Sequence, residues 1–399
     1  MSPIVRIPAA PSLRGRLLSA LFLLISVGPL SAQITEYPVS VYGLSGIAAG
    51  PDGAMWFSGD GQVGRITTAG VPTTYAVPTP NDTSYSITAG PDGAMWFTET
   101  ALNSGAPFAK IGRITTAGVI TEFPLPNPNC DPSAIVTGSD GALWFIESAA
   151  TNIGRITTSG VVTEIPLPAA LVDNGVSAMT AGPDGALWFA VYYSADAIVR
   201  MTTSGVFTSY TVQKNVYAGS SSITVGPDGA LWFADQYNYA IGRITTAGVI
   251  TEFPLTTPGD SPIGIAAGPD GALWYTSYLG GIGRITTSGT VAADVPTPTN
   301  TAGGFLGSIA AGPDGAMWFT DLTEKIGRIP TAAAGPSLLS GSVDNGATYV
   351  AGGLVPGSWA QVKGSNLASV TDYTWQMSDF AGLGNNLPNE FKGHHCDGE

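Results

Sequence analysis

Four carboxylates recur at matching places in a repeated motif. The motif is Gly-Pro-Asp-Gly-Ala-Leu-Trp-Phe, which occupies residues 226–233 in one copy, and the chain contains seven variants of it. Seven residues after the Asp of the motif, four copies carry an acid: Glu99, Glu147, Asp235 and Asp321. Carboxylates at matching places of one scaffold are suited to holding a hard cation or to removing a proton. Their chemistry depends on whether the fold brings them together.

The spacing of the motif indicates a repeat architecture. The Trp residues of the seven copies are Trp56, Trp96, Trp144, Trp188, Trp232, Trp274 and Trp318, with gaps of 40, 48, 44, 44, 42 and 44 residues. A regular period of this length is typical of propellers, solenoids and other repeat arrays.

Each repeat predicts four short antiparallel strands. In one copy the strands are residues 222–225, 230–234, 241–245 and 249–253, and the turns between them contain Pro-Asp-Gly and Thr-Ala-Gly. Pro presets φ in such a turn and Gly accepts a positive φ. No window shows sustained helical periodicity, so helices are not expected. Both faces of residues 230–234 are apolar, as in a sheet that packs between two neighbours.

The chain ends predict that the array closes into a ring. Residues 33–38 match the fourth strand of a repeat but stand before the first complete copy, while the seventh copy has no fourth strand after residues 326–329. Pairing the first segment with the last copy removes both free sheet edges. We therefore predict a seven-bladed β-propeller over residues 33–332, with four antiparallel strands in each blade and the N-terminal strand completing the last blade.

The segments outside the propeller have different compositions. Residues 1–32 read as a signal peptide, because a basic start precedes an apolar core at residues 17–27 that is too short to span a bilayer. This predicts a secreted or periplasmic protein with no membrane span in the mature chain. Residues 333–399 carry no propeller motif and read as a linker and a truncated, β-rich C-terminal module.

Composition excludes some partners and sites. The net charge is −14 and no run of Lys or Arg occurs, which argues against nucleic acid as a partner. Two cysteines, Cys130 and Cys396, are too few for a disulfide framework, and a buried free thiol is the better interpretation of Cys130. The pair His394-His395 lies in the C-terminal module and is weak evidence for a metal site.

Hairpin symmetry predicts a variable rim at the mouth of the propeller. Residues seven before and seven after each turn Asp should face each other, giving the pairs Ser45/Gly59, Tyr85/Glu99, Ser133/Glu147, Ser177/Val191, Ser221/Asp235, Ile263/Ser277 and Gly307/Asp321. The predicted ligand-facing residues are Tyr85, Glu99, Ser133, Glu147, Ser221, Asp235 and Asp321. The alternative is a solvated loop rim. A small molecule, peptide or protein is the partner expected at this mouth.

Two further roles follow from residue type. Asp131 and Glu147, with Ser133 between them in sequence, form a candidate site for Mg²⁺ or Ca²⁺. The turn Asp residues are interpreted as turn formers whose side chains bond to the backbone two residues on. Each copy also carries one Arg in its third strand, which is expected to stack on Trp or to bond turn carbonyls.

The repeat resembles that of the virginiamycin B (streptogramin B) lyases, and more loosely that of NHL-type and gluconolactonase-like propellers. The resemblance rests on residues 226–233, on Ile-Gly-Arg-Ile-Thr-Thr at residues 241–246, and on Ile-Thr-Glu-Phe-Pro-Leu at residues 250–255, and it covers residues 33–332. It implies a seven-bladed propeller and Mg²⁺-dependent elimination that opens a cyclic depsipeptide ester without water.

The resemblance also implies histidines that this chain lacks. The family pattern places a His seven before the turn Asp, where this chain has Ser45, Tyr85, Ser133, Ser177, Ser221, Ile263 and Gly307, and residues 33–332 contain no His. The weak catalytic candidates that remain are Glu147 and Asp321. His is the usual group that removes a proton near neutral pH. A non-catalytic binding protein is therefore the first interpretation, and a carbon–oxygen lyase or lactonase-like hydrolase is the alternative.

Overall fold

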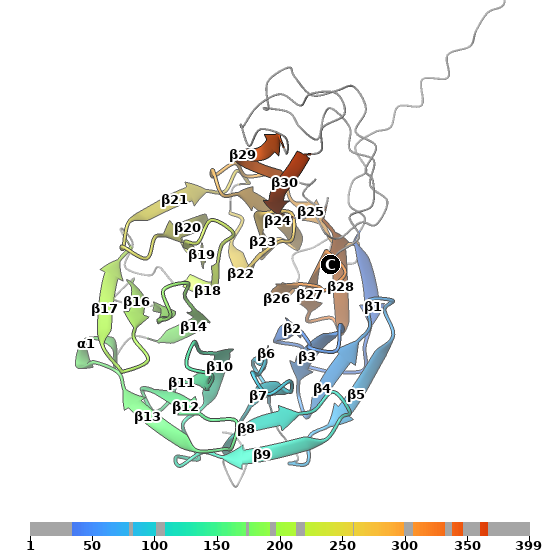
Figure 1. Ribbon diagram of the computed structural model, residues 1–399. Coiled ribbons are helices and arrows are strands. Elements are labelled where there is room, and N and C mark those ends of the chain that lie inside the picture. The colour runs from blue at the N-terminus through green and yellow to red at the C-terminus, as the bar shows by residue number, and fades with distance from the viewer. Residues whose placement is uncertain are drawn as a thin grey trace, which may run out of the picture.

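The computed structural model describes residues 34–331 except for 80–82, 101–107, 173–174, 192–196, 213–219, 258 and 299–305, together with residues 337–345 and 360–365. The described part of the main body is a ring of seven four-stranded antiparallel sheets (Figure 1). The predicted seven-bladed β-propeller is confirmed.

Blades 1–6 run from the centre of the ring outwards in chain order, and blade 7 does so for its first three strands. The first strands surround the centre, and each contacts the first strand of the next blade. They are β2 (Ile47–Ala49), β6 (Ile87–Ala89), β10 (Pro132–Thr137), β14 (Val176–Ala181), β18 (Ser220–Val225), β22 (Pro262–Ala267) and β26 (Leu306–Ala311). The second strands are β3 (Met55–Gly59), β7 (Met95–Thr100), β11 (Leu143–Glu147), β15 (Leu187–Val191), β19 (Leu231–Asp235), β23 (Ala272–Ser277) and β27 (Ala316–Asp321).

The outer half of each blade carries the repeated Arg and then the sheet edge. The third strands are β4 (Gln62–Ile66), β8 (Ala109–Ile114), β12 (Asn152–Ile156), β16 (Ala197–Met201), β20 (Ala240–Ile244), β24 (Gly281–Thr286) and β28 (Lys325–Pro330). The fourth strands are β5 (Pro72–Ala76), β9 (Ile120–Pro124), β13 (Val162–Pro166), β17 (Phe207–Thr211), β21 (Ile250–Pro254), β25 (Val295–Pro296) and β1 (Thr35–Pro38).

Three elements lie outside this pattern. A four-residue helical turn, α1 (Ala169–Val172), follows β13, although no helix was expected. Its length is a single turn, which is too short for the periodicity test that excluded helices. In the C-terminal part, β29 (Ser337–Asn345) pairs with β30 (Ala360–Ser365). The two strands lie in the segment predicted to be β-rich.

The N-terminal strand closes the ring as predicted. β1 pairs antiparallel with β28, with Thr35 opposite Arg328 and Pro38 opposite Lys325. Lys325 also lies 3.4 Å from Glu36, measured from Nζ to Oε2. The seventh sheet therefore has the order β1-β28-β27-β26, and it joins residues about 290 positions apart without leaving a free strand edge.

The motif Trp fills the space between blades. Six of the seven Trp side chains are completely buried and Trp274 is 5% exposed. Each one packs against apolar residues of the following blade; Trp232, for example, lies in a cluster with Ile265, Leu273 and Tyr275 of blade 6. The prediction that the Trp ring is buried between adjacent blades is confirmed, and it explains why both faces of the second strand are apolar.

The turn Asp, the Trp and the Arg of each blade form one hydrogen-bonded unit. In all seven blades the Trp Nε1 donates to Asp Oδ1 at 2.9–3.0 Å, and the Arg Nε donates to Asp Oδ2 at 2.5–2.7 Å. The backbone N–H two residues after the Asp also donates to Oδ1. In five blades the Arg also lies over the Trp ring.

This unit confirms the predicted Asp bond to the backbone and the predicted stacking of Arg on Trp. The Arg bonds the turn Asp itself, however, rather than the turn carbonyls. Burial alone would raise the pKa of Asp228, but hydrogen bonds from Trp232, Arg243 and Ala230 outweigh it and lower the pKa below the ordinary value. The turn end of every blade is therefore held by the same ion pair.

Candidate functional site

The mouth of the propeller lies at the opposite end of the blades from the Pro-Asp-Gly turns. The first strand of each blade begins there and the second strand ends there, so the mouth brings together the residues predicted to face a ligand. The hairpin register at this end differs from the prediction by one residue. Pro132, not Ser133, lies opposite Glu147; Ser220, not Ser221, lies opposite Asp235; and Leu306, not Gly307, lies opposite Asp321.

The cause of the register difference is a β-bulge in the first strand. Near the turn the pairing is symmetric, since Ile135 faces Phe145 and both lie five residues from Asp140. One extra residue is then inserted in the first strand, so the symmetric count fails beyond it. The same shift makes Val176 the partner of Val191 and Pro262 the partner of Ser277. In blades 3 to 7 the positions seven residues before the turn Asp therefore lie in or beside these bulges.

Hydroxyl groups from neighbouring blades hold the backbone of the mouth. Thr276 Oγ1 donates to the carbonyl of Gly307 at 2.8 Å, and Thr320 Oγ1 donates to the carbonyl of Ser45 at 3.0 Å. Ser45 Oγ in turn donates to the carbonyl of Tyr85 at 2.7 Å. Backbone groups that the bulge leaves outside the ladder are thus paired across blades. This network fixes the arrangement of the rim from blade 6 to blade 2.

The four acids are beneath the surface of the mouth rather than on it. Glu99, Glu147 and Asp321 are completely buried, and Asp235 is 1% exposed. Glu147, Asp235 and Asp321 end their second strands and Glu99 is the next-to-last residue of its own, so the four lie on corresponding strand ends of the ring, as the repeat predicts. Because these four carboxylates are buried, they do not form a solvated acidic rim.

Protein groups surround the buried acids. Glu147 Oε2 accepts a hydrogen bond from Asn152 at 3.1 Å, and Asp235 accepts bonds from the backbone and side chain of Asn238 at 3.2 and 2.9 Å. Asp321 accepts a bond from the backbone N–H of Thr323 at 2.8 Å. Glu99 lies opposite Lys110 in the ladder between β7 and β8. Each carboxylate is thus part of the packing of its own blade.

Burial shifts the pKa of two of these acids, Glu147 and Asp235. It raises the pKa of Glu147; the hydrogen bonds from Asn152 and Cys130 oppose the shift, and the charge of Glu164 adds to it. Burial also raises the pKa of Asp235, against the bonds from Asn238. The Cys130 side chain is a buried free thiol, as predicted, and burial with the nearby Glu147 raises its pKa as well.

The other predicted site residues have different surroundings. Tyr85 is exposed, and Ser133 is half-buried with its hydroxyl 2.9 Å from that of Ser148. The side chain of Ser221 lies outside the described part of the structure. Asp131 has a left-handed φ of 52° and is half-buried; burial raises the pKa of its carboxyl, and a hydrogen bond from Thr100 opposes the shift.

The predicted metal ligands have separate protein partners. Asp131 interacts with Thr100, whereas Glu147 interacts with Asn152 and Cys130. Among the described residues no group of three or more His, Cys, Asp or Glu side chains is arranged to hold a metal ion. The Mg²⁺ or Ca²⁺ site at Asp131 and Glu147 therefore stays a prediction.

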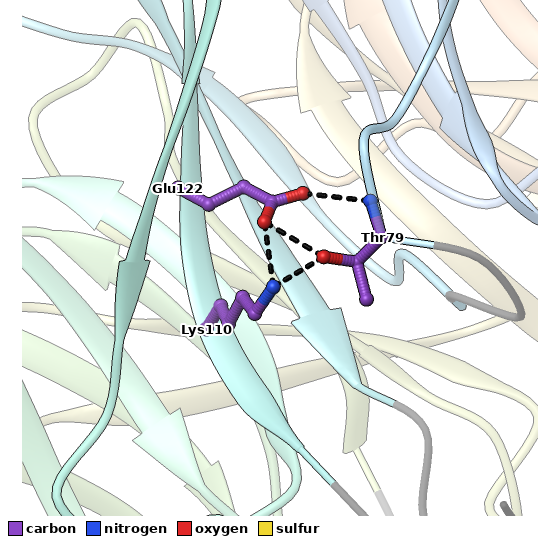
Figure 2. Close-up of polar contacts among 3 residues, drawn as sticks. All are labelled: Thr79, Lys110 and Glu122. Carbon is purple, nitrogen blue, oxygen red and sulfur yellow. Dashed lines mark hydrogen bonds and ion pairs between the residues drawn. The ribbon is translucent and has the colours of Figure 1, made fainter.

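A lysine side chain, Lys110, forms an ion pair on the mouth side of blade 2. Lys110 Nζ lies 2.5 Å from Glu122 Oε2 and also bonds the hydroxyl of Thr79, while the backbone N–H of Thr79 donates to Glu122 Oε1 at 3.0 Å (Figure 2). Thr79 follows the outer strand of blade 1, so this group ties the linker between the blades to blade 2. Sequence reasoning missed it, although blade 2 has Lys where blade 3 has Asn152 and blade 5 has Ala240.

A second group missed from the sequence lies in blade 6. Tyr275 Oη donates to Asp294 Oδ1 at 3.0 Å, Ser277 Oγ donates to Asp260 Oδ1, and the two carboxyl groups interact with each other. Tyr275 replaces the Phe that the other six blades carry at this place. That replacement is the signal in the sequence that identifies blade 6 as different.

The exposed apolar side chains differ between the two ends of the ring. At the mouth end, Tyr237 and Tyr239 lie on the turn after β19, Tyr278 and Leu279 on the turn after β23, and Leu322 on the turn after β27, each between 45% and 57% exposed. These turns belong to three consecutive blades. Tyr42 and Tyr85 add exposed rings at blades 1 and 2. At the opposite end, each of blades 1–5 exposes one Val at its outer turn: Val71, Val119, Val161, Val206 and Val249.

Known proteins with this repeat identify the family. The model of the virginiamycin B lyase family matches residues 25–172 and 169–337. This chain belongs to that family. The crystal structure of selenomethionine-substituted virginiamycin B lyase from Staphylococcus aureus is 35% identical, with a TM-score of 0.68 over 75% of this chain and 99% of that chain.

Two more structures extend the comparison within the family. A catalytically inactive histidine-to-alanine variant of the S. aureus lyase, solved with quinupristin, is 35% identical, with a TM-score of 0.67 over 75% of this chain and 99% of that one. A streptogramin B lyase is 33% identical, with a TM-score of 0.67 over 74% of this chain and 96% of that one. No curated protein sequence matches the chain.

Distant structures share the fold alone. The extracellular domain of a putative hybrid two-component system from B. thetaiotaomicron is 14% identical, with a TM-score of 0.57 over 79% of this chain and 46% of that one. Within the described residues, no helix has the length and apolar character needed to cross a bilayer.

Proposed function

We propose that this member of the virginiamycin B lyase family is a secreted, non-catalytic binding protein whose ligand occupies the mouth of the propeller. The observation that carries the proposal is the absence of histidine from the propeller sequence. Residues 33–332 contain no His, and the carboxylates nearest in sequence to the family's catalytic positions are buried and bonded within their own blades. Elimination needs a group that touches the substrate and removes a proton.

The exposed rings at the mouth support binding and indicate the ligand class. Tyr side chains offer rigid apolar area with a polar tip, which favours recognition of apolar and aromatic groups. Tyr237, Tyr239 and Tyr278, with Leu279 and Leu322, provide such area on three adjacent blades. A structural relative was solved with quinupristin, so the ligand tested first is a streptogramin B or another cyclic depsipeptide with aromatic side chains.

The deciding experiment measures binding and ring opening in the same samples. Calorimetry with a streptogramin B should give a binding signal, while chromatography should show no ring-opened isomer, with a virginiamycin B lyase as positive control. Tyr278→Ala should weaken binding at least about tenfold, as loss of an aromatic anchor does. Val249→Ala, at the opposite end of the ring and 62% exposed, is the matched control and should bind as the wild type does.

The outcomes separate this proposal from the alternatives. Ring opening without a mass change would establish an eliminating lyase that uses a group other than His. A product heavier by one water would establish a lactonase-like hydrolase. Absence of binding by both the wild type and the variants would reject a depsipeptide ligand.

The predicted Mg²⁺ or Ca²⁺ site at Asp131 and Glu147 stays a separate prediction. It is tested by melting curves in chelator and then in millimolar concentrations of each ion, because a ligand that binds only the folded state raises the melting temperature. A rise that Glu147→Gln abolishes, and that Asp235→Asn leaves intact, would place the ion in blade 3. An unchanged melting temperature would reject the site.

A further inference from the structure

Blade 6 departs from the repeat at several positions that lie together. Tyr275 occupies the place of Phe57, Phe97, Phe145, Phe189, Phe233 and Phe319, and Ser277 occupies the place that carries an acid in four other blades. Asp294 precedes Val295-Pro296 as Glu252 precedes Phe253-Pro254. Asp260 belongs to the linker between blades 5 and 6, which follows β21 and precedes β22. The substitutions therefore change one local environment as a set.

The contacts of this set bring two acids together inside the blade. Asp260 is 1% exposed, Ser277 is completely buried and Tyr275 is 1% exposed, while Asp294 is half-buried. Ser277 donates to one oxygen of Asp260, and Tyr275 donates to one oxygen of Asp294. The second oxygen of Asp260 is buried without a donor from the described residues. Both neighbouring hydroxyls are thus engaged, and the two carboxyl groups face each other.

Two buried carboxylates in contact cannot both be ionised without a large free-energy cost. The ionisable groups that act on Asp294 are Asp260, from the linker, and Tyr275, from β23. From β24, Gly281 lies beside Asp294 and brings no charge. The described surroundings therefore supply hydroxyl donors but no cation to neutralise the pair.

We propose that the protonated carboxyl of Asp294 bonds Asp260 and so forms a latch that ties the linker between blades 5 and 6 to the outer edge of blade 6, and that loss of this proton releases the tie. Burial, with the hydrogen bond and the charge of Asp260, raises the pKa of Asp294 to about 7, and the bond from Tyr275 opposes this shift. The proton is therefore held in mildly acidic solution and lost in mildly alkaline solution.

The outer segment is also attached by backbone bonds, from the N–H of Ala292 to the carbonyl of Arg284 and from the N–H of Thr297 to the carbonyl of Gly280, and the latch adds to these attachments. The outer strand β25 contains only two residues, Val295 and Pro296, whereas β21 in blade 5 contains five. The linker is attached to blade 5 through the bond from Ser261 Oγ to the carbonyl of Gln236. Ser261 also accepts, through its carbonyl, the N–H of Tyr278 on the mouth turn of blade 6. Release of the pair therefore acts on the support of one of the exposed mouth rings.

Hydrogen exchange of the intact protein tests the latch, with Asp294→Asn as the key variant. Asn is neutral and offers Asp260 a donor at every pH, so it stands in for the protonated carboxyl. At pH 5 the amides of residues 257–261 and 291–297 should exchange equally in the two proteins. At pH 8 they should open about tenfold more in the wild type, because the solution is then about one pH unit above the pKa of Asp294. Comparison at one pH cancels the intrinsic dependence of exchange on pH.

Two further variants make the result specific. Tyr275→Phe restores the residue of the other blades and removes the donor that favours the ionised Asp294, so the pH at which exchange accelerates should move upwards. Asp60→Asn makes the same chemical change at an exposed carboxylate and should behave as the wild type does. Should Asp294→Asn fail to fold, the direction of the Tyr275→Phe shift decides the question.

Two results would overturn the latch. One is an equal ratio of exchange between wild type and Asp294→Asn at pH 5 and pH 8. The other is protection at pH 8 that depends on Ca²⁺ and disappears with chelator, which would mean that a cation rather than a proton joins the two carboxyl groups.

Discussion

The two ends of the blades use carboxylates in opposite ways. At the turn end, Asp228 and its six counterparts accept hydrogen bonds from Trp and Arg in every blade, and the unit does not vary. At the mouth end, each acid is buried beside different residues: Asn152 bonds Glu147, and Asn238 bonds Asp235. Repetition at one end assembles and closes the ring, which leaves the other end free to differ from blade to blade.

The largest expected effect comes from opening the ring itself. Deletion of residues 34–38 removes β1, leaves β28 with a free edge and exposes the face that Tyr37 covers by stacking on Trp318. We expect a fall in the free energy of unfolding large enough to abolish the cooperative transition in denaturant. Deletion of a similar number of residues after 360 is the control. A truncated ring that unfolds at the wild-type midpoint would show that closure does not support either end.

A smaller loss in the free energy of unfolding is expected when one Trp side chain between two blades is removed. Trp232→Ala should lower the free energy of unfolding by about 3–5 kcal/mol, as large-to-small changes in a core do. It also removes the donor to Asp228 and the partner of Phe253. Denaturant titration measures the change. A loss below about 1 kcal/mol would mean that the motif Trp does not stabilise the packing between blades.

The ion pair at the turn end predicts a pH dependence of one sign. Asp228→Asn should cost about 1–3 kcal/mol at pH 7, because Arg243 loses a charged partner. The folded-state pKa of Asp228 lies below its ordinary value, so its contribution is present above about pH 4 and is lost as the pH falls through the folded-state pKa. Wild type and variant should therefore converge in stability towards pH 2. If the difference in the free energy of unfolding between wild type and Asp228→Asn is the same at pH 2 and pH 7, the charge of Asp228 does not cause it.

The buried acids at the mouth end predict the opposite sign and the smallest effect. The pKa of Glu147 is raised by burial, so folding binds a proton and the wild type loses stability as the pH rises from about its ordinary value of 4.5 to the raised pKa. Glu147→Gln removes this loss. We expect the variant to match the wild type near pH 4 and to be more stable than the wild type at pH 8, as measured by denaturant titration. A variant that is less stable at pH 8 would mean that the ionised carboxylate has a favourable partner.

The sequence predicts the framework well because the framework repeats. Seven copies of a turn Asp-Gly and a Trp indicate the order of the strands, the buried Trp ring and the closure by residues 35–38, and all three are confirmed, with the strand bounds shifted by one or two residues. Each is a consequence of local turn chemistry and of apolar faces, which a single chain displays directly. The partner of the repeated Arg was less accessible, because the Asp to which it bonds lies 13 to 21 residues away in sequence.

The mouth was harder to predict because it depends on departures from the repeat. Counting from Asp140 fails at Ser133, where one inserted residue moves Pro132 opposite Glu147. The burial of the four acids was not predicted either, because the repeat symmetry gives the end of the blade at which a residue lies but not how exposed its side chain is. The contact between Asp260 and Asp294 joins a linker to an outer strand, and no periodicity connects those two positions.

The closing strand places the interruption of the ring inside blade 7, between its third and fourth strands. In blades 1–5, a turn such as Thr245–Gly248 carries the chain directly from the third strand to the fourth, with Gly248 at a φ of 88°. In blade 7 the chain instead leaves β28 at Pro330, beside the start of β1 at Thr35. The interruption therefore falls where a four-residue turn would fit. Joining these neighbouring ends and cutting between two other blades would give a circular permutant with the same strand neighbours throughout.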